Sequence, residues 1–123
     1  MGSSAKFRFE DFEMWRLAVD ISVKLFIIAD MLTDMKKYRF AEQLNGAALS
    51  ITNNIAEGSG SFSDKDFANF LSISRKSVFE CANIIAVLNK VEIIKTEEKE
   101  ELFDSLSHLS SMITNFRKSL TKK

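Results

Sequence analysis

The sequence predicts an all-α protein, an up-down-up-down antiparallel four-helix bundle. Its 123 residues contain no proline and only four glycines, so the turn residues that a protein of many short strands needs are missing. Four stretches carry apolar residues at alternating steps of three and four, which is the period of an amphipathic helix. Short connections between long helices make successive helices antiparallel neighbours.

The first helix is expected over about residues 11–34. Its apolar residues form two adjacent stripes, and Val23 and Ile27 widen the apolar surface further. One stripe contains Phe12, Trp15, Val19, Ser22, Phe26 and Ala29, and the other contains Met14, Ala18, Ile21, Leu25, Ile28 and Leu32. A helix that packs against a single layer rarely needs so broad a band, so part of it is predicted to contact another subunit.

The second helix is expected over about residues 38–56 and the third over about residues 64–90. The strongest break in the helical pattern lies between them, where Gly58 and Gly60 offer the left-handed conformation of a helix stop and Ser63 is placed to cap the third helix. The inward stripes are Ala41, Leu44, Ala48, Ile51 and Ile55 on the second helix, and Phe67, Leu71, Ser74, Val78, Cys81, Ile85 and Leu88 on the third.

The fourth helix is expected from about Thr96, a candidate N-cap, to about Leu120. Its apolar seam is Leu102, Leu106, Leu109, Ile113, Phe116 and Leu120. The helices together form one expected domain over residues 9–121, and residues 1–8 are expected to be a disordered N-terminal segment.

The charge and cysteine content limit the function classes. Lys plus Arg and Asp plus Glu number 17 each, so the chain as a whole has no electrostatic argument for binding a polyanion. Cys81 is the only cysteine, and no apolar run approaches the ~20 residues of a membrane span, which favours a cytoplasmic location.

Signals for catalysis, metals and cofactors are weak. A di-iron bundle needs two Glu-x-x-His motifs, whereas His108 is the single histidine and Ser105 precedes it at that spacing. Cys81 falls on an inward stripe and is interpreted as a core residue. The Gly-Ser-Gly of the central turn lacks the ending of a phosphate-binding loop. We therefore expect no enzyme, no metal and no cofactor.

The end of the second helix breaks local rules, which is a reason to look for function there. Asn54 is a poor helix former, and Glu57 is a carboxylate at the wrong end of the helix dipole. Glu80 is polar on an apolar flank of the third helix and would need a partner if it were buried. The candidate turn residues are Asn54, Glu57, Gly58, Gly60, Ser63 and Glu80. They either hold the turn together or form a binding site.

The same stretch carries a family resemblance. The matching residues are Phe9, Asp11, Phe12, Trp15, Ala18, Tyr38, Gln43, Leu44, Ala47, Ala48, Ser50, Ile51, Asn54 to Gly58, Gly60, Ser63, Phe67, Phe70, Leu71, Ile73, Ser77 and Glu80. With them the chain closely resembles the four-helix-bundle family encoded by intervening sequences inside bacterial 23S ribosomal RNA genes. The resemblance implies a ring-shaped homopentamer with no known enzymatic activity, and kinship with the accessory proteins of diversity-generating retroelements.

Two function hypotheses follow. In the first, the protein is a non-enzymatic homo-oligomeric scaffold or accessory protein for a protein partner, such as a reverse transcriptase or a mobile-element factor. In the second, it is an RNA- or DNA-binding ring. The candidate nucleic-acid contacts are Lys36, Lys37, Arg39, Arg75, Lys76, Arg117, Lys118, Lys122 and Lys123. Asn45, Gly46 and Ser61 stand where the family usually has basic residues, and this difference favours the scaffold.

Overall fold

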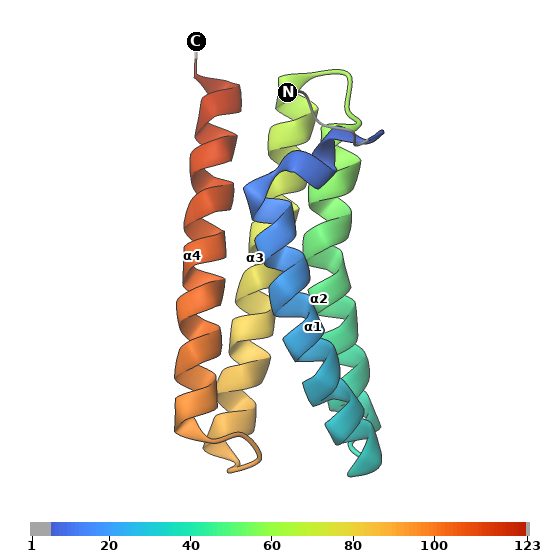
Figure 1. The fold of residues 1–123 in the computed structure, drawn as a ribbon, viewed down its shortest axis with the longest axis vertical. Coiled ribbons are helices and arrows are strands. Elements are labelled where there is room, and N and C mark those ends of the chain that lie inside the picture. The colour runs from blue at the N-terminus through green and yellow to red at the C-terminus, as the bar shows by residue number, and fades with distance from the viewer. Residues whose placement is uncertain (1–5, 123) are drawn as a thin grey trace.

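The computed structural model describes residues 6–122, which form four long α-helices and no strand. A short 3-10 helix, η1 (Arg8–Asp11), precedes α1 (Glu13–Asp34), and α2 (Tyr38–Ser59), α3 (Asp64–Lys90) and α4 (Thr96–Thr121) follow. Figure 1 shows the four helices running up and down, with both chain ends and the α2–α3 connection at one end of the bundle. The predicted four-helix fold is confirmed.

The core lies along the predicted stripes. Every residue of the stripes predicted for α2 and α3 is buried, and so are Leu102, Leu106, Leu109 and Ile113 of α4. On α1 the stripe from Met14 to Leu32 is buried, whereas Phe12, Trp15, Val19 and Phe26 of the other stripe are only partly covered. One of the two α1 stripes therefore faces the core and the other lies at its side.

The predicted end of α2 is wrong. The helix continues through Gly58 to Ser59, and no described glycine has a positive φ. Gly58 is buried because α3 packs directly on it: a Cβ built there would lie 2.7 Å from Cδ1 of Phe67 and 2.8 Å from Cβ of Phe70. Gly58 thus permits close helix packing and does not form a left-handed stop. The turn that follows is closed by the Gly60 and Ser61 amides, which donate to the carbonyls of Glu57 and Gly58.

Left-handed residues end α1 and α3 instead. Lys36 has φ 63° and Glu92 has φ 65°, although neither is a glycine. In both turns the next amide reaches back to a carbonyl in the last helical turn, from Lys37 to Leu32 and from Ile93 to Leu88, with distances of 2.8 and 2.9 Å. These bonds satisfy carbonyls that the helix end leaves free, which offsets the strain of a left-handed side-chain residue.

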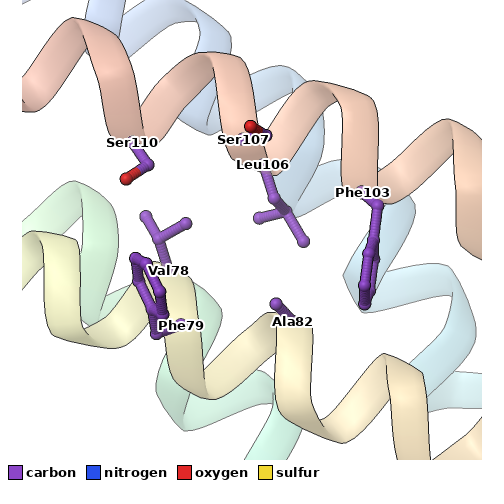
Figure 2. A pocket seen from close by; sticks show the side chains of 7 residues that line it. All are labelled: Val78, Phe79, Ala82, Phe103, Leu106, Ser107 and Ser110. Carbon is purple, nitrogen blue, oxygen red and sulfur yellow. The ribbon is translucent and has the colours of Figure 1, made fainter.

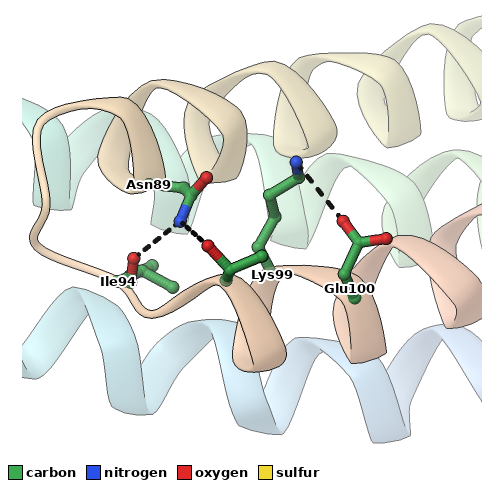
Figure 3. A network of polar contacts seen from close by, with 5 residues as sticks. Asn89, Ile94, Lys99 and Glu100 are labelled. Atoms are coloured by element: carbon green, nitrogen blue, oxygen red, sulfur yellow. Dashed lines mark hydrogen bonds and ion pairs between the residues drawn. The ribbon is translucent and has the colours of Figure 1, made fainter.

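The predicted caps of α3 and α4 have different outcomes. The Ser63 cap is confirmed, since its Oγ accepts a hydrogen bond of 3.1 Å from the Asp66 amide. Thr96 does not cap α4, because the N-cap position is Lys95 and Thr96 is already helical. Asn89 ties this turn together by donating to the Ile94 carbonyl (2.9 Å) and to the Thr96 hydroxyl (3.3 Å), and Figure 3 shows it beside the start of α4.

The N-terminal segment closes one end of the bundle. Residues 1–5 of the segment expected to be disordered lie outside the described residues, but Arg8 begins η1 and its Nε donates to the Ser59 carbonyl over 3.1 Å. The Arg8 guanidinium also stacks over Phe12 and Phe67, and these two rings meet Phe116. The ordered fold therefore begins before Phe9.

Candidate functional site

The outer groove between α2 and α3 holds two of the candidate turn residues, Asn54 and Glu80. Asn54 donates from Nδ2 to the carbonyl and the Oγ of Ser50, over 2.8 and 3.0 Å. Ser77 of α3 lies 2.8 Å from the same Ser50 Oγ and also contacts the Ile73 carbonyl (3.2 Å). A short hydrogen-bonded chain thus joins the two helices across the groove. The groove is therefore polar at this point, whereas the bundle core beneath it is apolar.

Further along the same groove the two helices leave a pocket of about 300 Å³. Its walls are mainly apolar, and Arg39 and Glu80 place opposite charges at its edge. The lining residues are Arg39, Phe40, Gln43, Glu80, Asn83, Ile84 and Val87. Phe40 and Val87 are exposed large hydrophobic residues, so the pocket presents apolar surface between polar groups. A concave, mainly apolar surface with a few polar groups is the usual form of a ligand- or partner-binding site.

Of the remaining candidate turn residues, some shape the turn and others are carboxylates at the surface. Gly58, Gly60 and Ser63 shape the end of α2 and the start of α3, as described above. Glu57 and Glu80 are exposed, so neither carboxylate needs a buried partner. Asn54 and Glu80 belong to the groove, whereas Gly60 and Ser63 lie at its far end.

Several polar residues that carry the family resemblance lie on this same face. From α2 these are the exposed Gln43 and the partly buried Ser50 and Asn54, and from α3 they are the buried Ser77 and the exposed Glu80. The other pocket residues carry no motif that the sequence alone would reveal. Phe40, Ile84 and Val87 could have been found only from the helical period, because each lies three or four positions from another groove residue.

The candidate basic residues are separated by the fold. Lys36, Lys37 and Arg39 lie at the α1–α2 connection, Arg75 and Lys76 lie in α3, and Arg117, Lys118 and Lys122 lie at the end of α4. Lys123 lies outside the described residues. Figure 1 places the α1–α2 connection and the C-terminus at opposite ends of the bundle. The described candidates therefore form three small basic regions, two of which lie on the α3–α4 side of the bundle.

Two of these basic side chains already have structural partners. Arg75 donates from Nε to Thr114 Oγ1 (3.1 Å), and Arg117 donates from Nε to the Ala68 carbonyl (3.3 Å). Both bonds connect α3 to α4. Among residues 6–122, no group of three or more His, Cys, Asp and Glu side chains is arranged to hold a metal ion.

Cys81 is a buried core thiol. Burial raises its pKa from 9.0 to about 12, and the negative charge of Glu80 adds to the shift. The unfolded chain releases this proton near pH 9, whereas the folded chain holds it to about pH 12. Because the unfolded state binds fewer protons across this interval, the thiol's contribution to stability falls as the pH rises through it.

We therefore expect the Cys81→Ala variant to lose less stability than the wild type on going to alkaline pH. Urea unfolding of both proteins at neutral pH and at pH values above 9.0 measures this difference. All other side chains are the same in both proteins, so the comparison isolates the thiol. A stability difference that stays constant over the whole range would contradict the expectation.

The chain is thus a four-helix-bundle protein with a mainly apolar pocket between α2 and α3. A family model described as 23S rRNA-intervening sequence protein matches residues 10–115, so the chain belongs to this family. The described helices include none that is long and apolar enough to cross a membrane.

A solved structure shares the fold. It is the crystal structure of a protein of unknown function from the S23 ribosomal protein family of Bacteroides thetaiotaomicron VPI-5482. The similarity has a TM-score of 0.80 and 22% sequence identity, and it covers 85% of this chain and 98% of that one. No curated protein matches the chain.

Proposed function

We propose that the protein is a non-enzymatic scaffold that assembles with copies of itself and binds a protein partner. The observation that supports this most directly is the apolar surface on the outer side of α1. Val23 and Ile27 lie one turn apart and are 52% and 64% exposed, and Met31 follows one turn later. Single exposed apolar residues are ordinary, but a strip along three successive turns is typical of a surface that another molecule covers.

The groove between α2 and α3 is the proposed surface for a partner. It offers apolar walls, a charged residue on each helix and a hydrogen-bonded polar edge, which together favour specific protein contact. The family resemblance suggests five subunits in a ring, and it suggests a reverse transcriptase or another mobile-element factor as the partner.

Sedimentation of the purified protein over a range of concentrations tests the self-association. We expect an oligomer that persists in salt, and we expect Ile27→Lys to dissociate it because a charge would enter an apolar contact. Phe62→Lys is the matched control, since Phe62 is a fully exposed apolar residue on the α2–α3 turn. A wild-type protein that stays monomeric at all concentrations would overturn the proposal.

Nucleic-acid binding is the alternative, and salt separates it from protein contact. A ring could bring the three small basic regions of several subunits together even though each subunit is neutral. Fluorescently labelled structured RNA and duplex DNA would then bind tightly and lose orders of magnitude in affinity between about 50 and 200 mM salt. Binding of that kind would favour the alternative, whereas no binding at the lower salt concentration would favour the protein scaffold.

A further inference from the structure

We infer that the outer side of α1 in one copy packs into the outer groove between α3 and α4 of the next copy. The inference rests on the proposed self-association and identifies the two surfaces that meet. We call the first surface the acidic face, formed by Asp20, Val23, Ile27, Asp30 and Asp34. We call the second the basic seam, formed by Arg75, Phe79, Lys99 and Phe103 around a floor of Val78, Ala82 and Leu106.

The basic seam is a groove of about 220 Å³ with an apolar floor. Figure 2 shows Phe79 and Val78 of α3 toward one end and Phe103 of α4 toward the other, with Ala82 and Leu106 between them. Phe79 is 55% exposed even though it stands beside a core helix contact. The hydroxyls of Ser107 and Ser110 lie along the α4 side of the groove. An apolar side chain from a partner would fill this space.

Cations are fixed beside both aromatic rings. The guanidinium carbon of Arg75 lies 4.8 Å from the ring centroid of Phe79, and Nζ of Lys99 lies 5.2 Å from that of Phe103. The bond from Arg75 to Thr114 holds the first of these cations in place. Cation–π stacking limits the freedom of both side chains, so less entropy is lost when a carboxylate binds them.

The other charges at the seam leave it net positive. Glu100 lies 3.3 Å from Lys99 and is shown beside it in Figure 3, but its side chain is 60% exposed and solvent screens the pair. Arg117, one turn beyond Thr114 on the same side of α4, adds a further positive charge. The seam therefore presents three cations and one carboxylate.

The acidic face has the complementary pattern. Its five positions recur at steps of three and four, which places them together on the side of α1 that points away from the buried stripe. Val23 and Ile27 lie between Asp20 at one end and Asp30 and Asp34 at the other. Arg16 continues this face toward the N-terminus, where it is paired with Asp11. The face thus offers apolar side chains flanked by carboxylates, and Lys24 lies at its α4 side, where it lines a pocket with Ile27, Glu98 and Glu101.

The two surfaces also match in length and direction. At about 1.5 Å per residue, Asp20 and Asp34 are about 21 Å apart along α1, and Thr114 and Lys99 are about 22 Å apart along α4. Helices α1 and α4 run in opposite directions (Figure 1). In two copies that point the same way, Asp20 would therefore meet Arg75 while Asp34 meets Lys99. The exposed Val23 and Ile27 would then lie over the apolar floor.

A contact between two different surfaces has consequences for the assembly. Such head-to-tail contacts propagate from copy to copy and close into a ring when the rotation permits. Helix α4 contacts both α1 and α3, so α4 lies between the acidic face on α1 and the α3 side of the basic seam. The contact can close into a ring only if it rotates each copy relative to the previous one. It also leaves the α2/α3 groove uncovered.

Charge reversal tests the contact with four variants of the full chain. Asp20→Lys with Asp34→Lys reverses the acidic face, Arg75→Glu with Lys99→Glu reverses the basic seam, and a fourfold variant carries all these changes. The control variants are Glu10→Lys with Glu42→Lys and Lys65→Glu with Lys90→Glu, which make the same kind of charge change at exposed positions outside both surfaces. Circular dichroism confirms that each variant is folded, and sedimentation measures its self-association.

We expect each reversed pair to weaken self-association at least about tenfold, because like charges then face each other at both ends of the contact. The fourfold variant should recover self-association, since its charges are exchanged but complementary, and both controls should behave as the wild type. An oligomer that survives both reversals, or a fourfold variant that stays dissociated, would overturn this contact alone. A monomeric wild type would overturn the self-association and the contact with it.

Discussion

Replacing Phe67 with alanine is expected to lower the free energy of unfolding by about 3–5 kcal/mol. Phe67 is 1% exposed and lies where three parts of the chain meet. Its ring centroid is 6.0 Å from that of Phe12 at the start of α1 and 5.4 Å from that of Phe116 near the end of α4. The Arg8 guanidinium covers it at 5.2 Å, and the ring also fills the space that Gly58 leaves.

The substitution would leave a cavity that the surrounding helices cannot readily fill. Its rim is formed by Arg8 of η1, the N-cap residue Phe12 of α1, the Gly58 backbone of α2 and Phe116 of α4, so collapse would require several elements to move together. Urea unfolding measures the loss, and Phe62→Ala is the control because that ring is fully exposed. The control should stay within about 0.5 kcal/mol of the wild type. Similar losses in the two variants would contradict this account of the core.

The helical period predicted most of the fold because it reports which side chains are buried. The stripes on α2 and α3 are buried throughout, and α3 has the bounds that Ser63 and Lys90 predicted. On α1 the period could not distinguish the core stripe from its neighbour, because both contain apolar residues. It did reveal that the helix has more apolar surface than one layer covers, and Val23 and Ile27 are indeed exposed.

Helix ends were predicted less well, because tertiary contacts and the local chain decide them together. Glycine is the usual signal for a left-handed stop, yet Lys36 and Glu92 adopt this conformation and the described glycines do not. The role of Gly58 depends on Phe67 and Phe70, which come from another helix and cannot be assigned from local sequence.

Only part of the candidate site could be predicted, because contacts between helices complete it. The helical period places Gln43, Ser50 and Asn54 on one side of α2, but only the packing of α3 against it shows that Ser77 completes the hydrogen-bonded chain. The grouping of charged residues at the basic seam also depends on the fold. Arg75 and Lys99 are distant in sequence, and the antiparallel pairing of α3 and α4 places both beside one groove.

Gly58→Ala and Gly46→Ala are expected to change stability in opposite directions. Alanine is favoured over glycine inside a helix by about 1 kcal/mol, and both positions are helical. At Gly46 nothing lies within 4 Å of an added Cβ, so this gain should appear as a stabilisation of about 0.5–1 kcal/mol.

At Gly58 the added Cβ would lie 2.8 Å from Cβ of Phe70, an atom that cannot turn away by changing rotamer because it is fixed to the α3 backbone. Helix α3 must therefore move away from α2, and overpacking of this kind costs about 1–3 kcal/mol. After the helix gain is subtracted, we expect Gly58→Ala to lose about 1–2 kcal/mol. Thermal and urea unfolding of the two variants give the sign directly. If Gly58→Ala were as stable as Gly46→Ala, the close approach of α2 and α3 would not be what requires glycine at position 58.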